Sequence, residues 1–235
     1  MGRLLGAGAA LAAGSAVPAG GGEAAAAGTM GGVNVPRRDS PLPIIPIPPQ
    51  VKATEGLAPL PDAHLWYWDT GGSGVPIVFL HPASGSVESW PYQQPFFARK
   101  GFRVIAYSRR GFYRSDSGPA DRPGTGADDL RLLLDHLRVD RFHGVGVAAG
   151  GGHLLDFALS YPERLRGMVI SGSLTGLQEP AYRETLARLR PEGFFGMPAD
   201  FIELGPAYRA ANPEGVQQWL EFHHRAVTTS ISQAS

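Results

Sequence analysis

The chain of 235 residues contains no cysteine. A disulfide, a zinc–thiolate site and a cysteine nucleophile are therefore excluded. A secreted protein can fold without disulfides when its hydrophobic core is large enough, so this absence leaves the cellular compartment open.

An excess of charge of one sign is also lacking, because 21 Lys and Arg side chains balance 21 Asp and Glu side chains. A neutral chain without runs of like charge argues against nucleic acid or an anionic membrane surface as the main partner. The apolar stretch at residues 4–13 is too short and too rich in glycine to span a bilayer. We expect no nucleic-acid partner and no integral membrane span.

The first 50 residues differ in composition from the rest. Arg3 precedes the short apolar stretch, and small residues continue through Ala27. One charge, a short apolar stretch and an Ala-x-Ala-like cleavage site are typical of a secretory signal peptide; a disordered low-complexity tail is the alternative. We expect a secreted or periplasmic protein, with the cytoplasm as the alternative location.

Residues 36–49 contain six prolines. This density favours an extended polyproline conformation and predicts a semi-rigid linker. A strap docked on the domain is the alternative for the apolar residues 44–47. We assign residues 1–50 to leader and linker, and expect one folded domain from about Val51 onward.

The most informative segment is Gly146-Val147-Ala148-Ala149-Gly150, which reads as Gly-x-Ser-x-Gly with alanine in place of serine. It follows an apolar stretch at residues 142–147 and precedes a helix start of small residues at 149–155. In a nucleophile elbow the central residue occupies a sharp, strained turn, and the glycines let strand and helix approach closely. Alanine fits such a turn but carries no hydroxyl.

Two other structures are compatible with these five residues. One is an ordinary strand-to-helix turn of small residues, which this segment alone leaves open. The other is a dinucleotide-binding loop, since Gly144, Gly146 and Gly150 fit a loose glycine fingerprint. That fingerprint needs an acidic residue at the end of the next strand, and residues 165–170 end in Ser171-Gly172-Ser173 instead, which argues against it.

The surrounding elements narrow the choice. We expect strands at 75–80, 103–107, 142–147 and 165–170, with helices between them. His81-Pro82-Ala83 follows the first strand, and Ser108-Arg109-Arg110-Gly111-Phe112-Tyr113-Arg114-Ser115 follows the second. This order resembles the α/β-hydrolase superfamily, in its esterase and haloperoxidase-like branch, where the corresponding turns are His-Gly and Asp-x-Arg-Gly-x-Gly-x-Ser. Pro82, Ser108 and Tyr113 depart from that pattern at turn positions, and the resemblance runs from about Leu65 to about Arg225.

The resemblance implies an α/β fold with a mostly parallel sheet flanked by helices, and a helical cap after the sixth strand. The core would comprise residues 51–174 and the cap residues 175–235, with cap helices opening at Pro180 and Pro213. The implied activity is hydrolysis of a carboxylic ester or related acyl substrate, without a metal or organic cofactor. The partner would be a small ester-like molecule.

The resemblance also implies roles for individual residues. Ala148 would hold the nucleophile position, and the backbone N–H groups of Ala149 and Ala83 would form the oxyanion hole. Trp90, Phe194 and Phe195 are candidates for binding the substrate; the alternative for the two phenylalanines is the cap's own core.

The catalytic acid and base are harder to place. In the family they follow the nucleophile on loops after later strands, but after Ser173 the pattern is mostly helical. His223 and His224 are neighbours on one expected helix and cannot both face one pocket, so a surface or core role is favoured; His153 reads as a packing or polar-network residue. We expect the final strands of the family to be absent, with the acid and base on a missing segment or a second chain. A degenerate family member is the alternative.

Two functional hypotheses follow. The first is a serine hydrolase in which alanine replaced the nucleophile, and the second is a natural ligand-binding pseudoenzyme on a hydrolase scaffold. A dehalogenase or epoxide hydrolase with aspartate at position 148 is disfavoured, because such enzymes often place tryptophan after the nucleophile and Ala149 stands there.

Overall fold

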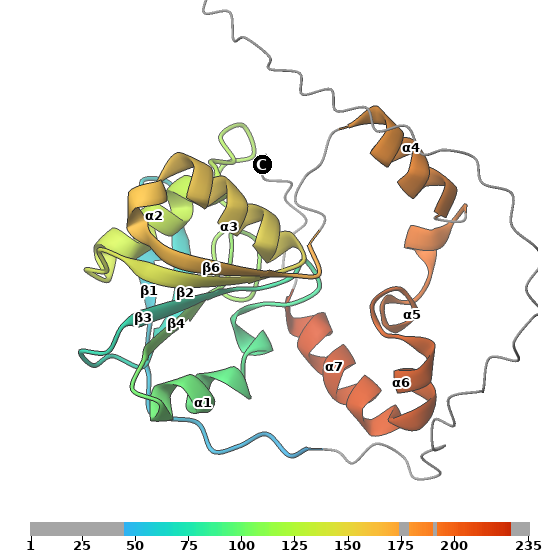
Figure 1. Ribbon diagram of the computed structural model, residues 1–235, viewed down its shortest axis with the longest axis horizontal. Coiled ribbons are helices and arrows are strands. Elements are labelled where there is room, and N and C mark those ends of the chain that lie inside the picture. Colours follow the sequence, from blue (N-terminus) through green and yellow to red (C-terminus); the bar gives the residue numbers. More distant parts are fainter. Residues whose placement is uncertain (1–44, 174–178, 190–191, 227–235) are drawn as a thin grey trace, which may run out of the picture. The chain divides into compact units, whose positions relative to one another are not determined.

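A six-stranded sheet forms the centre of the computed structural model, which describes residues 45–173, 179–189 and 192–226 (Figure 1). The strand order is β1-β2-β4-β3-β5-β6. β1 and β2 pair antiparallel with each other, and β2 pairs antiparallel with β4, whereas β4, β3, β5 and β6 run parallel. The carboxyl ends of the four parallel strands therefore meet at one edge of the sheet. The strands are β1 (Thr54–Pro59), β2 (His64–Asp69), β3 (Pro76–Leu80), β4 (Arg103–Tyr107), β5 (Phe142–Val147) and β6 (Leu165–Ser171).

Both faces of the sheet are covered by helices (Figure 1). On one face α2 (Gly126–His136) and α3 (Ala149–Ser160) pack, and the other carries α1 (Gln93–Arg99) and the short helix η1 (Val87–Ser89). Alternate residues of β3 divide between two hydrophobic clusters: Val78 and Leu80 face α2 and α3, while Ile77 and Phe79 face α1 and η1. Burial on both sides explains why β3 and β4 read as nearly continuous apolar runs.

α2 packs its leucine side chains against the sheet. Leu130, Leu133 and Leu134 are fully buried against the sheet. The Thr125 hydroxyl accepts a hydrogen bond from the Asp128 backbone N–H and caps the helix, which therefore begins at Gly126.

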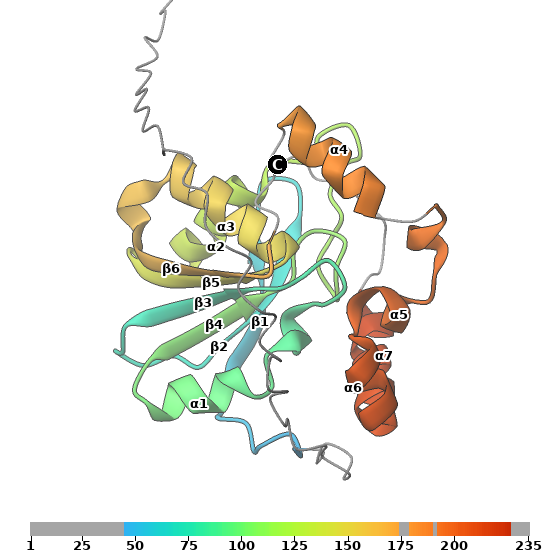
Figure 2. The same cartoon turned by 45° about the vertical axis from the view of Figure 1, so that its right-hand side comes forward.

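Within the described residues, four α-helices follow the sixth strand, in agreement with the fold predicted from the sequence (Figure 2). They are α4 (Pro180–Leu189), α5 (Ala199–Glu203), α6 (Pro206–Ala211) and α7 (Pro213–Ala226), with the short η3 (Phe194–Gly196) between α4 and α5. None of the described helices is long and apolar enough to cross a bilayer. The predicted leader lies outside the described residues.

The end of the proline-rich segment is held on the domain by hydrogen bonds. The Tyr92 hydroxyl donates to the Ile45 carbonyl, the Arg99 guanidinium donates to the Pro49 carbonyl, and Gln94 bonds to both the N–H and the C=O of Val51. Ile45 itself is 68% exposed. Backbone hydrogen bonding, rather than apolar burial, therefore docks this strap.

The outer edge of β6 is open among the described residues, because no described strand pairs with it. Met168 and Val169 are 45% and 57% exposed on this strand. An apolar strand edge of this kind is a template for pairing with further polypeptide.

Candidate functional site

Ala148 occupies a strained turn at the carboxyl edge of the sheet, between β5 and α3. Its backbone angles are φ 49° and ψ −116°, in the positive-φ region that residues other than glycine rarely adopt. The turn is held from two sides: the Ala148 N–H donates to the Ser171 carbonyl of β6 at 3.0 Å, and the Ala148 carbonyl accepts from the Gly151 N–H at 3.0 Å. Ala148 is half-buried, so its methyl group is not part of a closed core.

Glycine on either side of this turn is required by close packing. A Cβ atom at Gly146 would lie 2.5 Å from the Gly150 carbonyl oxygen, and one at Gly150 would overlap the backbone carbonyls of Leu80 and His81. The start of α3 therefore touches both the strand that precedes it and the end of β3. This is the close approach for which we expected glycines in the sequence.

Replacing Ala148 by glycine is expected to raise the free energy of unfolding by about 1 kcal/mol. The backbone conformation costs roughly 1–3 kcal/mol with a Cβ atom present, and the greater freedom of glycine in the unfolded chain offsets part of that gain. Denaturant unfolding measures the change. Ala158→Gly, inside α3, is the matched control and should lose about 1 kcal/mol; equal losses in the two variants would contradict the strain at Ala148.

The predicted oxyanion donors lie in the segments that directly follow two neighbouring strands. Ala149 is the first residue of α3, where backbone N–H groups have no partner within the helix. Ala83 lies in an exposed turn after β3, closed by a hydrogen bond from the Gly85 N–H to the Pro82 carbonyl. Because β3 and β5 pair directly, both loops emerge at the same edge of the sheet.

His81 anchors the loop that carries Ala83. Its ring is fully buried, and Nδ1–H donates to the Pro82 carbonyl at 2.7 Å while Nε2 accepts from the Arg109 backbone N–H at 3.0 Å. Burial, and then the positive charge of Arg109, hold the His81 pKa well below its ordinary value. The neutral ring thus ties the loop after β3 to the loop after β4, a role that the sequence reasoning did not assign.

Arg109 and His153 complete the buried polar layer beneath these loops. Burial lowers the Arg109 pKa to about 10, and its guanidinium donates to the Pro82 carbonyl at 3.3 Å and lies 4.8 Å from the centre of the Phe112 ring. Burial and the Arg109 charge lower the His153 pKa to about 4. A pKa this low makes the His153 ring a weak base, and its buried Nδ1 has no hydrogen-bond partner among the described residues, so the structure gives no support to a role as general base.

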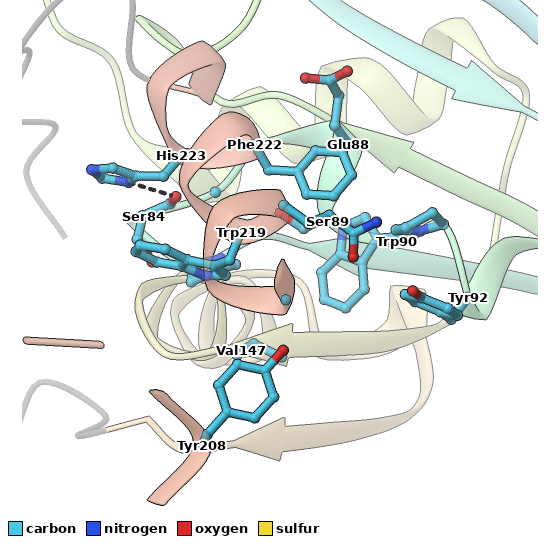
Figure 3. A pocket seen from close by; sticks show the side chains of 15 residues that line it. Ser84, Glu88, Ser89, Trp90, Tyr92, Val147, Tyr208, Trp219, Phe222 and His223 are labelled. Carbon is cyan, nitrogen blue, oxygen red and sulfur yellow. Dashed lines mark hydrogen bonds between the residues drawn. The ribbon is translucent and has the colours of Figure 1, made fainter. Parts of the chain in front are cut away.

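A cavity of about 310 Å³ lies next to the elbow (Figure 3). Trp90, one of the predicted substrate-binding residues, lines it, and Val147 immediately precedes Ala148. Phe194 lines neither this cavity nor a second one of about 310 Å³ beside the strap, and the Phe195 side chain lies outside what the structure describes. The other lining residues are Pro82, Ser84, Gly85, Glu88, Ser89, Pro91, Tyr92, Tyr208, Gly215, Gln218, Trp219, Phe222 and His223.

The last turns of α7 are hydrogen-bonded to the loops of the core. The His223 ring bonds through Nδ1 to the Ser84 carbonyl at 3.0 Å (Figure 3), and Arg225 pairs with Glu88 at 3.0 Å. His224 is exposed. The two neighbouring histidines therefore do have different surroundings, and only His223 reaches the wall of the cavity.

One histidine–carboxylate pair was not anticipated from the sequence. His64 Nδ1 lies 2.8 Å from Asp116 Oδ2, with the two side chains 54% and 53% exposed. β2, which begins with His64, is three strand spacings or about 14 Å from β5, too far for His64 to act on an atom at Ala148. Within residues 45–173, 179–189 and 192–226, no cluster of three or more His, Asp or Glu side chains is placed to hold a metal ion.

Comparison with known proteins adds three findings. Residues 75–232 match the family model described as the alpha/beta hydrolase fold. A 2-hydroxy-6-oxononadienedioate/2-hydroxy-6-oxononatrienedioate hydrolase of Paraburkholderia phymatum is 34% identical over 160 residues, which are 66% of this chain and 51% of that protein. A bifunctional esterase/perhydrolase of Acinetobacter calcoaceticus is 34% identical over 105 residues, which are 42% of this chain and 36% of that protein.

Solved structures show the same fold. A structure titled as an N-acyl homoserine lactone degrading enzyme is 32% identical, with a TM-score of 0.57 over 72% of this chain and 65% of that one. A carboxylesterase study of Nitrososphaera gargenis provides another, at a TM-score of 0.58 and 24% identity over 74% of this chain and 68% of that one. The chain spans about half the length of the curated relative from Paraburkholderia phymatum.

Proposed function

The chain belongs to the α/β-hydrolase family. We propose that the site around Ala148, at the carboxyl edge of the sheet, binds a carboxylic ester or a related acyl substrate. The conformation of Ala148, φ 49° and ψ −116° in the turn between β5 and α3, carries this proposal. It is the geometry in which an elbow holds an attacking side chain above the sheet. Ala148 has no oxygen to attack with, so the chain as it stands has the site without its nucleophile.

Serine at this position would supply the missing chemistry. Its hydroxyl oxygen would attack the substrate carbonyl, and the backbone N–H groups of Ala149 and Ala83 would stabilise the developing oxyanion. The proton of the hydroxyl would pass to a histidine base and then to the leaving alcohol, and water would release the acyl group by the same route.

We further propose that the acid and the histidine base lie on a missing segment or on a second chain. The open β6 edge, with exposed Met168 and Val169, supports this because it offers a pairing position for further polypeptide beside the elbow. The relatives' greater length is consistent with such a segment.

The names of the relatives support a carbonyl substrate. The hydrolases of Paraburkholderia and Comamonas are named for 6-oxo acids, and the Acinetobacter protein is named an esterase. By name, all of these proteins hydrolyse carbonyl compounds. Among such compounds, we propose an ester as the substrate of the present chain.

The test is Ala148→Ser in the full-length protein from the source organism, assayed with p-nitrophenyl acetate. We expect a gain of at least about 10³-fold over the alanine form, which retains only the background from oxyanion-hole and binding interactions. Ala149→Ser is the control, because it adds the same hydroxyl one residue away from the apex of the turn. The absence of any gain at position 148, or an equal gain at 149, would contradict the proposal.

The second candidate is a binding protein that retains the site without turnover. Ala148 itself favours it, since a methyl group stands where the reaction needs oxygen. It predicts that the natural gene encodes alanine at 148, and sequencing that codon from the source genome separates the two candidates.

A further inference from the structure

The cavity beside the elbow has an aromatic wall drawn from both parts of the fold. Trp219 and Phe222 come from α7 and Tyr208 from α6, while Trp90 and Tyr92 come from the loop after β3 (Figure 3). Trp90 is held firmly, with only 5% of its surface exposed and its ring 4.8 Å from that of Phe79. Trp219 stacks on His223 at 5.0 Å with the rings 6° from parallel. Trp90 and Trp219 are thus each packed against another ring of the protein.

The charges around the cavity disfavour an anion. Among the described residues that line it there is no lysine or arginine, and the one carboxylate is Glu88, whose charge is paired with Arg225. A carboxylate placed here would lose its hydration without meeting a lysine or arginine among these lining residues, and would face Glu88. An uncharged ring loses little by leaving water and gains stacking contacts.

The cavity is also placed to receive part of a molecule whose carbonyl lies at the elbow. Val147 lines it and is bonded directly to Ala148, and Pro82 and Ser84 line it on either side of Ala83. A substituent of the carbonyl carbon or of the alcohol oxygen could therefore extend from the elbow into the aromatic space.

We propose that this cavity is an aryl subsite: it binds an uncharged aromatic substituent of the substrate between Trp90, Trp219 and Phe222, and discriminates against a carboxylate in the same place. The inference rests on the proposed acyl site for the position of the carbonyl, and deepens it by naming the class of substituent. An aromatic ring of one or two fused cycles suits a space of about 310 Å³ at the small end of ligand pockets.

Binding by the Ala148 chain provides the test, because a chain without a nucleophilic oxygen at this position would bind the ligand without consuming it. Titration calorimetry, with tryptophan fluorescence as a second readout, compares methyl 3-phenylpropanoate with monomethyl succinate. We expect the aryl ester to bind at least about tenfold more tightly, and Trp219→Ala to remove about tenfold of that affinity. Trp219→Phe, which keeps an aromatic face, should stay within about threefold of the parent.

Phe201→Ala is the matched control, since Phe201 is an aromatic residue of α5 that does not line the cavity and contacts Arg209 instead. It should leave the affinity unchanged, and circular dichroism should show both alanine variants folded. Equal or tighter binding of the succinate ester, no measurable aryl binding, or equal losses in Trp219→Ala and Phe201→Ala would overturn the aryl subsite. Failure of Ala148→Ser to hydrolyse an ester would overturn the proposed activity and leave this binding result standing.

Discussion

Replacing Asp129 by alanine is expected to lower the free energy of unfolding by about 3 kcal/mol or more, because it removes the main partner of a buried cation. The Arg110 guanidinium donates to both carboxylate oxygens of Asp129 at 2.8 Å, and the two side chains are 3% and 5% exposed. Hydrogen bonding to Asp129 raises the Arg110 pKa against the opposing effect of burial. Among the described carboxylates, Asp62, at 2.9 Å, is the one that would remain as a partner in the variant.

Asp135→Ala on the same helix is the control. Asp135 pairs with Arg131 and Arg164, but its side chain is 45% exposed, so its loss should cost no more than about 1 kcal/mol. Urea unfolding of both variants measures the difference. A double replacement, Arg110→Met with Asp129→Leu, should recover most of the stability because it removes both buried charges together. Equal small losses at 129 and 135 would show that the buried pair contributes little.

Arg110 of this ion pair lies in the turn at residues 108–115, which carries part of the family resemblance. Arg110 matches the arginine of the turn pattern, but nothing near it in the sequence identifies Asp129 as its partner, 19 residues further along. The turn was predicted from residue types, whereas the pairing depends on α2 lying over the end of β4.

Some strands could likewise be predicted from their own sequence, and others could not. β4 and β5 have the bounds predicted from their apolar runs, since both are central strands whose own sequence specifies burial. β1 and β2 were not predicted. β1 buries only Ala58 and contains Gly56 and Pro59, so it lacks a strand pattern of its own and is defined by its pairing with β2.

At the site, the sequence was sufficient to name candidate residues whose place depends on a single local turn. It was not sufficient for residues whose place depends on how the cap packs. Ala83 and Ala148 lie in turns at the carboxyl edge of the sheet, Ala149 begins α3 beside them, and the roles of all three stay predictions. The contact of His223 with the Ser84 carbonyl joins residues 139 apart, and the inclusion of Trp219 in the cavity depends on how α7 packs. Aromatic content alone pointed to Phe194, which lines neither cavity described above.

Replacing Gly150 by alanine is expected to destabilise the fold by about 3 kcal/mol, even though alanine is the better helix former. The added Cβ would overlap the backbone carbonyl oxygens of Leu80 and His81, which belong to the centre of the sheet and cannot rotate away as a side chain could. Overpacking of this kind costs typically 1–3 kcal/mol and sometimes more, and here it displaces the helix that holds the elbow.

Gly152→Ala is the matched control in the same helix, two residues along the chain. A Cβ atom there would meet nothing within 4 Å, so the substitution should raise the free energy of unfolding by about 0.5–1 kcal/mol through helix propensity alone. The two variants carry the same chemical change and are expected to shift thermal and urea unfolding in opposite directions. If both stabilised the protein, α3 would not be pressed against the end of β3, and the turn at Ala148 would lack the support that keeps it strained.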